Sequence, residues 1–276
     1  MNSLPITVQA TLVPKKGSSE EECEDSFRID YATSFGGHHL GSVAVAISDG
    51  ATESMFAKKW ARMVSWHAVE NAHCIPDGFA GPGDSFRHFI GSVMGRWDSW
   101  VSSYVRQRVS EGRPLRWYEE AKLASGAFAT LLAVHFEEAS EGFWHAAALG
   151  DSCLFHIRSQ SVIDKFPVQS SADFGISPEL LGSKADLDLV CERTYFDRGS
   201  FVRGDEFFLM TDSLAAWFVS VIENANSGQM EESLEKMRIF SHAKNRPAFE
   251  SWISSMIDNG RLRNDDITLI CIRISE

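Results

Sequence analysis

The apolar segments of this chain are mostly short runs of strand-forming residues, and several are joined in pairs by brief polar turns. Two short apolar runs separated by a polar turn are typical of an antiparallel β-hairpin. The expected strands cover residues 43–47, 131–136, 143–149, 154–157, 162–166, 207–210 and 267–274. This pattern predicts antiparallel rather than parallel sheets.

Amphipathic helices separate these groups of strands. Apolar residues recur at helical spacing in four segments, at about 53–74, 86–105, 214–225 and 249–257. A Rossmann-type sheet would alternate strand and helix throughout and would carry G-x-G-x-x-G after its first strand, and that motif is absent. We therefore predict an α+β fold in which helices cover antiparallel sheets.

One polar segment interrupts this order without a clear period. Residues 169–200 contain Gly175, Pro178, Gly182 and Gly199 and show neither strand nor helix spacing. A stretch of this length is typical of a functional flap or lid, and we expect one here instead of a packed element. No linker or repeat divides the 276 residues, so we expect a single domain.

The charge balance excludes some classes of partner. The net charge is −12, with 38 acidic residues against 26 basic ones, which argues against binding to nucleic acid or to an anionic membrane. The chain has no signal-peptide pattern and no run near the roughly 18 apolar residues of a membrane span, so we expect a cytoplasmic protein. Five scattered cysteines without a C-x-x-C pair form neither a disulfide framework nor a zinc motif. Cys153 lies in an apolar strand, which disfavours a nucleophilic role.

Four aspartates stand at the ends of expected strands, namely Asp49, Asp151, Asp212 and Asp265. Carboxylates that meet at one edge of a core repel one another unless a cation neutralises them. An oxygen-only ligand set favours Mg²⁺, Mn²⁺ or Ca²⁺ over zinc, and Gly50 would let a backbone carbonyl approach the ion. For any one aspartate taken alone, ordinary turn chemistry is the alternative explanation.

Six short motifs occur along the chain in a fixed order, and together they resemble those of the PP2C-like (PPM) metal-dependent phosphatases. They are Glu24-Asp25-Ser26-Phe27, Ser48-Asp49-Gly50, Gly126-Ala127-Phe128-Ala129-Thr130, Leu149-Gly150-Asp151-Ser152, Met210-Thr211-Asp212-Ser213 and Asp265-Asp266-Ile267-Thr268. No single motif is specific. Their order over residues 8–274 carries the resemblance, which is greater to the compact bacterial branch than to the eukaryotic one.

The resemblance implies a fold and a cofactor. The fold would be a PP2C-like sandwich of two antiparallel β-sheets flanked by α-helices (α-β-β-α), spanning residues 1–276 as one phosphatase domain. The cofactor would be two Mn²⁺ or Mg²⁺ ions, with a third, weaker site at Asp151. Carried over by motif, Asp49 would bridge both ions, and the Gly50 carbonyl would ligate one of them. Asp212 and Asp265 would complete the other site.

The resemblance also implies roles around the metals. Glu24 and Asp25 would hold metal-bound waters, and a bridging water would attack phosphorus in line without a protein nucleophile. The activity would be that of a serine/threonine protein phosphatase. The partner of this protein would be a phosphorylated protein substrate. By removing the phosphate, this protein would oppose a serine/threonine kinase.

Three departures from the family pattern leave alternatives open. No arginine precedes Glu24, so Lys15 or Lys16 would have to bind the substrate phosphate as point charges, unless both are simply solvated. Ser213 replaces the family's glycine after Thr-Asp, and Ala51 replaces a histidine of the eukaryotic relatives, so water would protonate the leaving group. The alternatives are a phosphatase-like regulatory module that binds a phosphorylated partner without turnover, and hydrolysis of a small phosphorylated metabolite.

Overall fold

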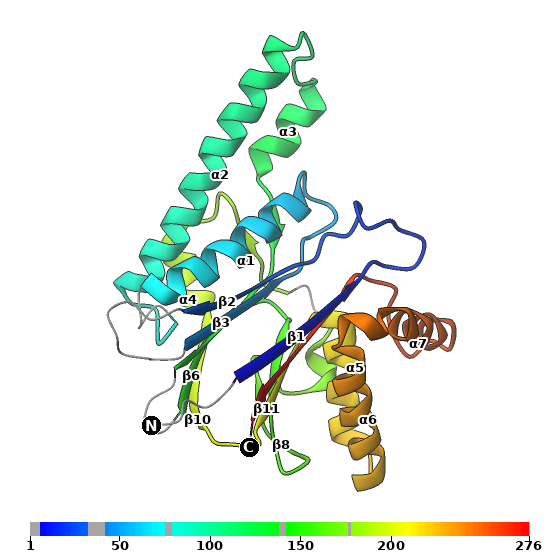
Figure 1. Cartoon of the computed structure of the whole chain (residues 1–276). Coiled ribbons are helices and arrows are strands. Elements are labelled where there is room, and N and C mark those ends of the chain that lie inside the picture. Colours follow the sequence, from blue (N-terminus) through cyan, green and yellow to red (C-terminus); the bar gives the residue numbers. More distant parts are fainter. Residues whose placement is uncertain (1–5, 33–41, 75–78, 138–141, 176–177, 276) are drawn as a thin grey trace.

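Two five-stranded antiparallel sheets form the centre of the protein (Figure 1). The computed structural model describes residues 6–32, 42–74, 79–137, 142–175 and 178–275. The first sheet has the order β1 (Ile6–Val13), β12 (Ile267–Ile274), β11 (Glu206–Met210), β7 (Cys153–Arg158) and β8 (Ser161–Phe166). The second has the order β10 (Tyr195–Phe201), β6 (Gly142–Leu149), β5 (Leu131–Glu137), β3 (Ser42–Ser48) and β2 (Ser26–Ala32). A short ladder joins β4 (Phe128–Ala129) to β9 (Leu181–Gly182).

The two sheets pack face to face through alternate apolar side chains. Val43, Val45 and Ile47 of β3 share one buried cluster with Phe207 and Leu209 of β11. The intervening residues of the same strands face the helices, so the central strands are buried on both faces. Burial on both faces explains why these strands are continuous apolar runs in the sequence.

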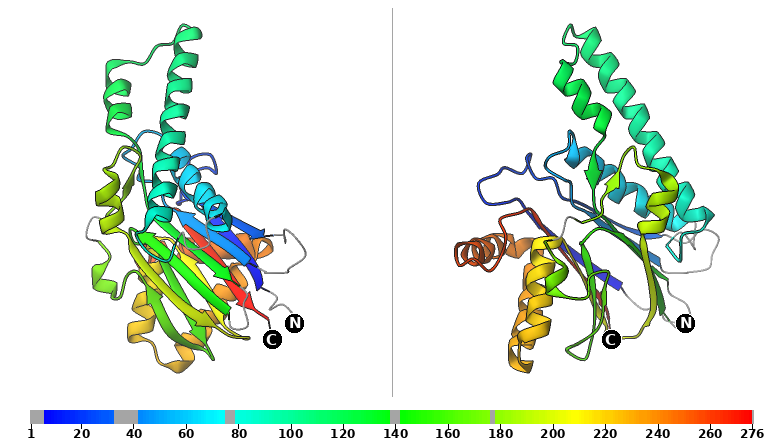
Figure 2. Two further views of the ribbon diagram at one scale, coloured as in Figure 1. Left: turned by 90° about the vertical axis from the view of Figure 1, so that its left-hand side faces the viewer. Right: turned by 180° about the vertical axis from the view of Figure 1, so that it is seen from behind.

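Helices cover the outer face of each sheet (Figures 1 and 2). The second sheet is covered by α1 (Ala57–Cys74), α2 (Asp84–Ser110) and α4 (Leu187–Arg193). The first sheet is covered by α5 (Asp212–Asn224), α6 (Ser227–Phe240) and α7 (Arg246–Asp258). The remaining elements are α3 (Trp117–Ser125), which lies beside the end of α2 that projects away from the sheets, and the 3₁₀ turns Ser171–Asp173 and Ala243–Asn245. The predicted α-β-β-α sandwich is confirmed.

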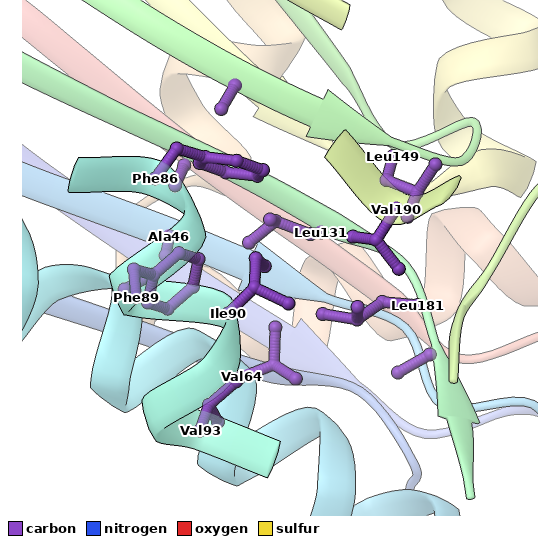
Figure 3. Close-up of a cluster of buried hydrophobic side chains, with 14 of the residues drawn as sticks. Ala46, Val64, Phe86, Phe89, Ile90, Val93, Leu131, Leu149, Leu181 and Val190 are labelled. Carbon is purple, nitrogen blue, oxygen red and sulfur yellow. The ribbon is translucent and has the colours of Figure 1, made fainter. Parts of the chain in front are cut away.

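The helix side of the second sheet shows how the sequence period specifies packing. Phe86, Phe89, Ile90 and Val93 are spaced by three or four residues, so they lie on one face of α2. Figure 3 shows these side chains meeting Leu131 from β5 in one buried cluster. Spacing alone therefore placed this helix correctly, although α2 extends beyond the predicted 86–105 at both ends.

The prediction of an unpacked flap over residues 169–200 is partly wrong. Residues 187–193 form α4 and residues 195–201 form β10, which pairs with β6 along its whole length. As an edge strand, β10 carries polar and half-exposed residues, so it lacks the apolar run that marks a buried strand. The hairpins β5–β6 and β7–β8 match the prediction, whereas the helix expected from about 53 begins at Ala57. Among the described helices, none is both long and apolar enough to cross a lipid bilayer.

A buried carboxylate anchors the end of the first sheet where β11 begins. Asp205 is fully buried and accepts hydrogen bonds from His156 Nε2 at 2.9 Å, from Arg158 Nε at 2.8 Å and from the Val202 N–H at 3.0 Å. Burial alone would raise its pKa, but these donors outweigh burial and hold the pKa of Asp205 below its ordinary value. The carboxylate therefore ties β7 to the turn that enters β11.

We expect Asp205→Ala to lower the free energy of unfolding by about 3 kcal/mol, because it leaves several buried donors without an acceptor. Urea unfolding followed by circular dichroism measures the change. The control is Asp98→Ala on the exposed face of α2, which should change the free energy by less than about 0.5 kcal/mol. A loss below about 1 kcal/mol for Asp205→Ala would contradict the anchoring role.

Candidate metal centre

One end of the sandwich gathers the ends of strands from both sheets. Asp49 follows β3, Asp212 follows β11, Asp265 precedes β12, and Asp151 lies in the connection that carries the chain from β6 to β7. Because β3, β6 and β11 all end at this edge while β12 starts there, the four carboxylates face one region.

That region is a hollow of about 360 Å³. It is lined by Asp49, Gly50, Ala51, Thr52, Thr130, Asp151, Gly175, Pro178, Leu180, Asp212, Arg263 and Asp265. The structure thus brings together all five residues that the sequence proposed as direct metal ligands. Residues from the start of the proposed flap also border the hollow.

Gly50 occupies a position that only glycine fits. A Cβ atom there would lie 2.9 Å from the carbonyl carbon of Ala57 and 3.0 Å from the backbone oxygen of Glu24. The neighbouring Asp49 is fixed by Thr130, whose hydroxyl accepts from the Asp49 N–H at 2.9 Å and whose own N–H donates to the Asp49 carbonyl at 2.8 Å. The Gly126–Thr130 motif therefore positions the Asp49-Gly50 turn.

Asp25 lies behind the hollow and is almost fully buried. Its Oδ2 accepts hydrogen bonds from Thr268 Oγ1 at 2.7 Å and from Thr211 Oγ1 at 3.1 Å. Its Oδ1 is buried with no hydrogen-bond partner among the described residues. Burial, followed by repulsion from Asp266 and Asp212, raises the pKa of Asp25 to about 8. An unpartnered buried carboxylate oxygen needs a proton, a water or a cation nearby.

The carboxylates in the hollow also need protons or cations to balance their charge. Burial, reinforced by repulsion from Asp25 and Asp212, raises the pKa of Asp49 well above its ordinary value. Burial and the charge of Asp151 raise the pKa of Asp212 to about 6, against the opposing effect of Arg263, and burial raises the pKa of Asp151.

The donor set therefore fits hard divalent cations, because it combines carboxylate oxygens with an approachable glycine carbonyl. In the described part of the chain, however, no three His, Cys, Asp or Glu side chains are arranged closely enough to hold an ion. The carboxylates would have to move together to share one.

Arg263 is a site residue that the sequence reasoning missed. Its Nη2 donates to Asp212 Oδ2 at 2.9 Å, and its side chain remains about half exposed at the rim of the hollow. The buried Ser213 hydroxyl donates to the Arg263 carbonyl at 2.9 Å and so fixes the backbone of this arginine. The sequence reasoning looked for a phosphate-binding arginine only ahead of Glu24. The signal that it overlooked was an arginine two residues before the proposed ligand Asp265.

The two lysines proposed to bind phosphate do not line the hollow. Lys16 Nζ forms an ion pair with Asp258 of α7 at 2.6 Å. The N–H groups of Lys15 and Glu24 donate to the two carboxylate oxygens of Asp266, at 2.8 and 2.7 Å. Asp266, which the sequence reasoning did not propose as a site residue, thereby holds together the two ends of the loop between β1 and β2.

Two other expectations concern neighbouring residues. The Glu24 carboxylate accepts from Thr52 Oγ1 at 2.5 Å, beside the hollow, and its role in holding water stays a prediction. Cys153 is fully buried, and burial raises the pKa of its thiol, which agrees with the prediction that it is not a nucleophile.

Comparison with known proteins gives the fold a name. No family model and no curated protein sequence matches the chain. Solved structures do. The serine/threonine phosphatase Stp1 from Staphylococcus aureus is 12% identical, with 99% of this chain and 97% of that chain covered and a TM-score of 0.57. The photosystem II phosphatase PBCP is 16% identical over 98% and 99% of the two chains, with a TM-score of 0.53. The serine/threonine phosphatase PstP/Ppp of Mycobacterium tuberculosis is 12% identical over 98% and 99%, with a TM-score of 0.51. The chain has the PP2C-like phosphatase fold.

We expect Mn²⁺ to raise the melting temperature, and to do so more strongly at about pH 8 than at about pH 5.5. The folded-state pKa values of Asp25 and Asp212 lie above the unfolded value of about 4, so the folded protein binds more protons in this window and loses stability as the pH rises. Cations displace those protons, so their affinity increases with pH. At 100 times the Kd, binding adds about 2.7 kcal/mol, or roughly 5–10 °C.

Differential scanning fluorimetry at the two pH values measures this shift, and Ca²⁺ at equal ionic strength serves as a comparison. Asp212→Asn should reduce both the shift and its pH dependence. A shift that is equal at both pH values would contradict the proposed competition between protons and cations.

Proposed function

We propose that this protein is a Mn²⁺- or Mg²⁺-dependent serine/threonine protein phosphatase that hydrolyses phosphomonoesters. The observation that carries the proposal is a cluster of buried carboxylates with raised pKa values at the strand ends of a PP2C-like sandwich. An exposed guanidinium at the rim of the same hollow supplies the complementary charge for a phosphate. Two of the solved structures that share the fold are serine/threonine phosphatases.

The ligand set proposed for two ions consists of Asp49, the Gly50 carbonyl, Asp212 and Asp265, with Asp151 at a third site. Glu24 and Asp25 would act through water, for which the unpartnered oxygen of Asp25 is suited. When bound, such ions lower the pKa of water and neutralise charge on phosphoryl oxygens. The protein's own part is to fix the strand ends that carry these carboxylates, so that a movement of the side chains would be enough to gather them around the ions.

Arg263 is the residue best placed to bind the substrate phosphate. Its guanidinium has five N–H donors, so it can keep its hydrogen bond to Asp212 and still present a two-pronged face to phosphate oxygens. Ser213 fixes the backbone that carries it. The two departures from the family pattern would then be connected. Arg263 would replace the arginine that is missing ahead of Glu24, and Ser213, which stands in place of glycine, would hold the backbone of Arg263.

A phosphatase-like regulatory module remains the second candidate function, and two observations favour it. Arg263 already pairs with Asp212, a proposed ligand, and the carboxylates are not gathered closely enough to hold an ion. A module of this kind would bind a phosphorylated partner through Arg263 without turnover. The opposing serine/threonine kinase and a cytoplasmic location are part of the leading proposal.

We expect the purified protein with Mn²⁺ to hydrolyse an aryl phosphate, and Asp212→Asn to lower kcat by at least about 100-fold, because it removes a proposed ligand of the ions that would neutralise transition-state charge. Steady-state kinetics over a range of Mn²⁺ concentration and pH measure this. Asp98→Asn, on α2 and away from the hollow, is the matched control. Tight Mn²⁺ binding with no turnover under any of these conditions would instead support the regulatory module.

Arg263→Ala should lower kcat/KM for the aryl phosphate by about 10- to 150-fold, which corresponds to losing about 1.5–3 kcal/mol of charge-assisted hydrogen bonding. Arg263→Lys should recover only part of the loss, because lysine lacks the planar fork. Lys16→Ala is the comparison variant and should change kcat/KM by less than about twofold, since its charge is already paired. A large loss in Lys16→Ala with none in Arg263→Ala would return the phosphate-binding role to the lysine.

A further inference from the structure

A second hollow, of about 640 Å³, adjoins the acidic one on the outer side of the first sheet. It lies between α5, α6 and α7 and the turn that follows α7, elements that stand together beside the sheet in Figure 1. Arg263 lines both hollows, and Ser213, next to Asp212, lines the second. The two hollows therefore meet at the residue proposed to bind phosphate. We call the second hollow the helical groove.

Two tryptophans form an aromatic surface in the helical groove. Trp217 of α5 and Trp252 of α7 meet edge to face, with ring centroids 5.1 Å apart. Trp252 is held in turn by Phe249, on which it stacks, and by Phe240. Both indoles are only partly buried, and neither indole N–H donates to another described residue. Rigid aromatic side chains of this kind provide contact area at a low cost in conformational entropy.

The rim of the helical groove nearest the acidic hollow is basic. Arg261 is exposed and has no ion pair with any described residue, and Arg263 is half exposed. Lys236, farther along the groove, is already paired with Glu232 at 2.6 Å. On a chain with a net charge of −12, two neighbouring arginines with free donors form a local site for acidic groups.

The turn that carries these arginines is held in place. Gly260 has a φ of +68°, which lets the chain reverse after α7, and the Arg261 N–H donates to the Met256 carbonyl at 2.8 Å. Leu262 is buried between the two exposed arginines. Ser213 then ties the Arg263 carbonyl to α5. The backbone positions of both arginines relative to Asp212 are therefore set by the fold before any ligand binds.

We propose that the helical groove binds the polypeptide of the substrate next to its phosphorylated residue, with an aromatic or large aliphatic side chain on Trp217 and Trp252 and an acidic side chain at Arg261. This inference rests on the proposed phosphatase function and narrows its substrate class to phosphoproteins with acidic, apolar sequences beside the phosphosite. The volume suits a bound segment, since ligand sites measure about 300–1,000 Å³. A small phosphorylated metabolite would occupy only the acidic hollow.

The test compares phosphoserine peptides that carry Glu and Phe either before or after the phosphoserine with matched peptides that carry Ala instead. We expect kcat/KM to be at least tenfold higher for one Glu/Phe peptide than for its Ala counterpart. Arg261→Glu should abolish this preference, mainly through KM, and leave aryl phosphate hydrolysis within about twofold of the unmodified protein. Trp217→Ala should reduce the preference for Phe over Ala. Arg203→Glu, an exposed charge reversal in the turn between β10 and β11, is the control.

Equal kcat/KM for all peptides, or equal losses for peptide and aryl phosphate in Arg261→Glu, would overturn the groove proposal while leaving the phosphatase function intact. If the unmodified protein does not hydrolyse the aryl phosphate, the proposed function itself fails. The groove proposal is then tested by measuring the Kd of a labelled Glu/Phe phosphopeptide by fluorescence anisotropy. Binding that Arg261→Glu weakens at least tenfold supports the groove, and binding that it leaves unchanged rules the groove out.

Discussion

The confinement of several carboxylates at one end of the sandwich is the constraint on which the site depends. Asp25, Asp49 and Asp212 are held in surroundings that disfavour their charged forms, and they also repel one another. A flexible loop would relieve this repulsion by moving the groups apart. Strand ends cannot, because the ladders of both sheets fix them. The fold therefore keeps a high density of negative charge that protons or cations must balance.

Neutral and cationic groups around the cluster fix its geometry without cancelling its charge. Thr130 holds the Asp49 backbone, and Thr211 and Thr268 hold one oxygen of Asp25. Arg263 offers partial compensation to Asp212 from the rim, where it stays accessible to a ligand. Under the proposed function, this division of roles links the departures from the family pattern, because Ser213 fixes the backbone of the arginine proposed to bind phosphate.

The central strands could be predicted from sequence, whereas the edge strands β1, β2 and β10 were not predicted. Strands such as β3 and β5 are buried on both faces and so appear as apolar runs, and α2 has a clear helical period. The edge strand β10 is polar because one side meets solvent, so its sequence resembles a loop. The N-terminal strand β1, whose partner β12 comes from the other end of the chain, was also missed, although Ile6–Val13 is rich in the β-branched residues that favour strands.

The same distinction applies to the site. The five proposed direct ligands were predictable because each stands at the end of a recognisable strand or in a short motif. Arg263 and Asp266 were not, because their roles depend on contacts between distant segments, such as the bond from the Lys15 N–H to Asp266 across 251 positions. Asp265 stands between them and was found only because it belongs to an ordered series of motifs.

Calorimetric titration with Mn²⁺ at about pH 8, in two buffers of different ionisation enthalpy, tests the role of the carboxylate cluster most directly. The proposed function predicts that at least two ions bind, that protons are released because the carboxyl groups must ionise, and that Asp49→Asn removes binding at both tight sites. Absence of binding, or binding without proton release that Asp49→Asn leaves unchanged, would contradict the assignment of this acidic end as a metal centre.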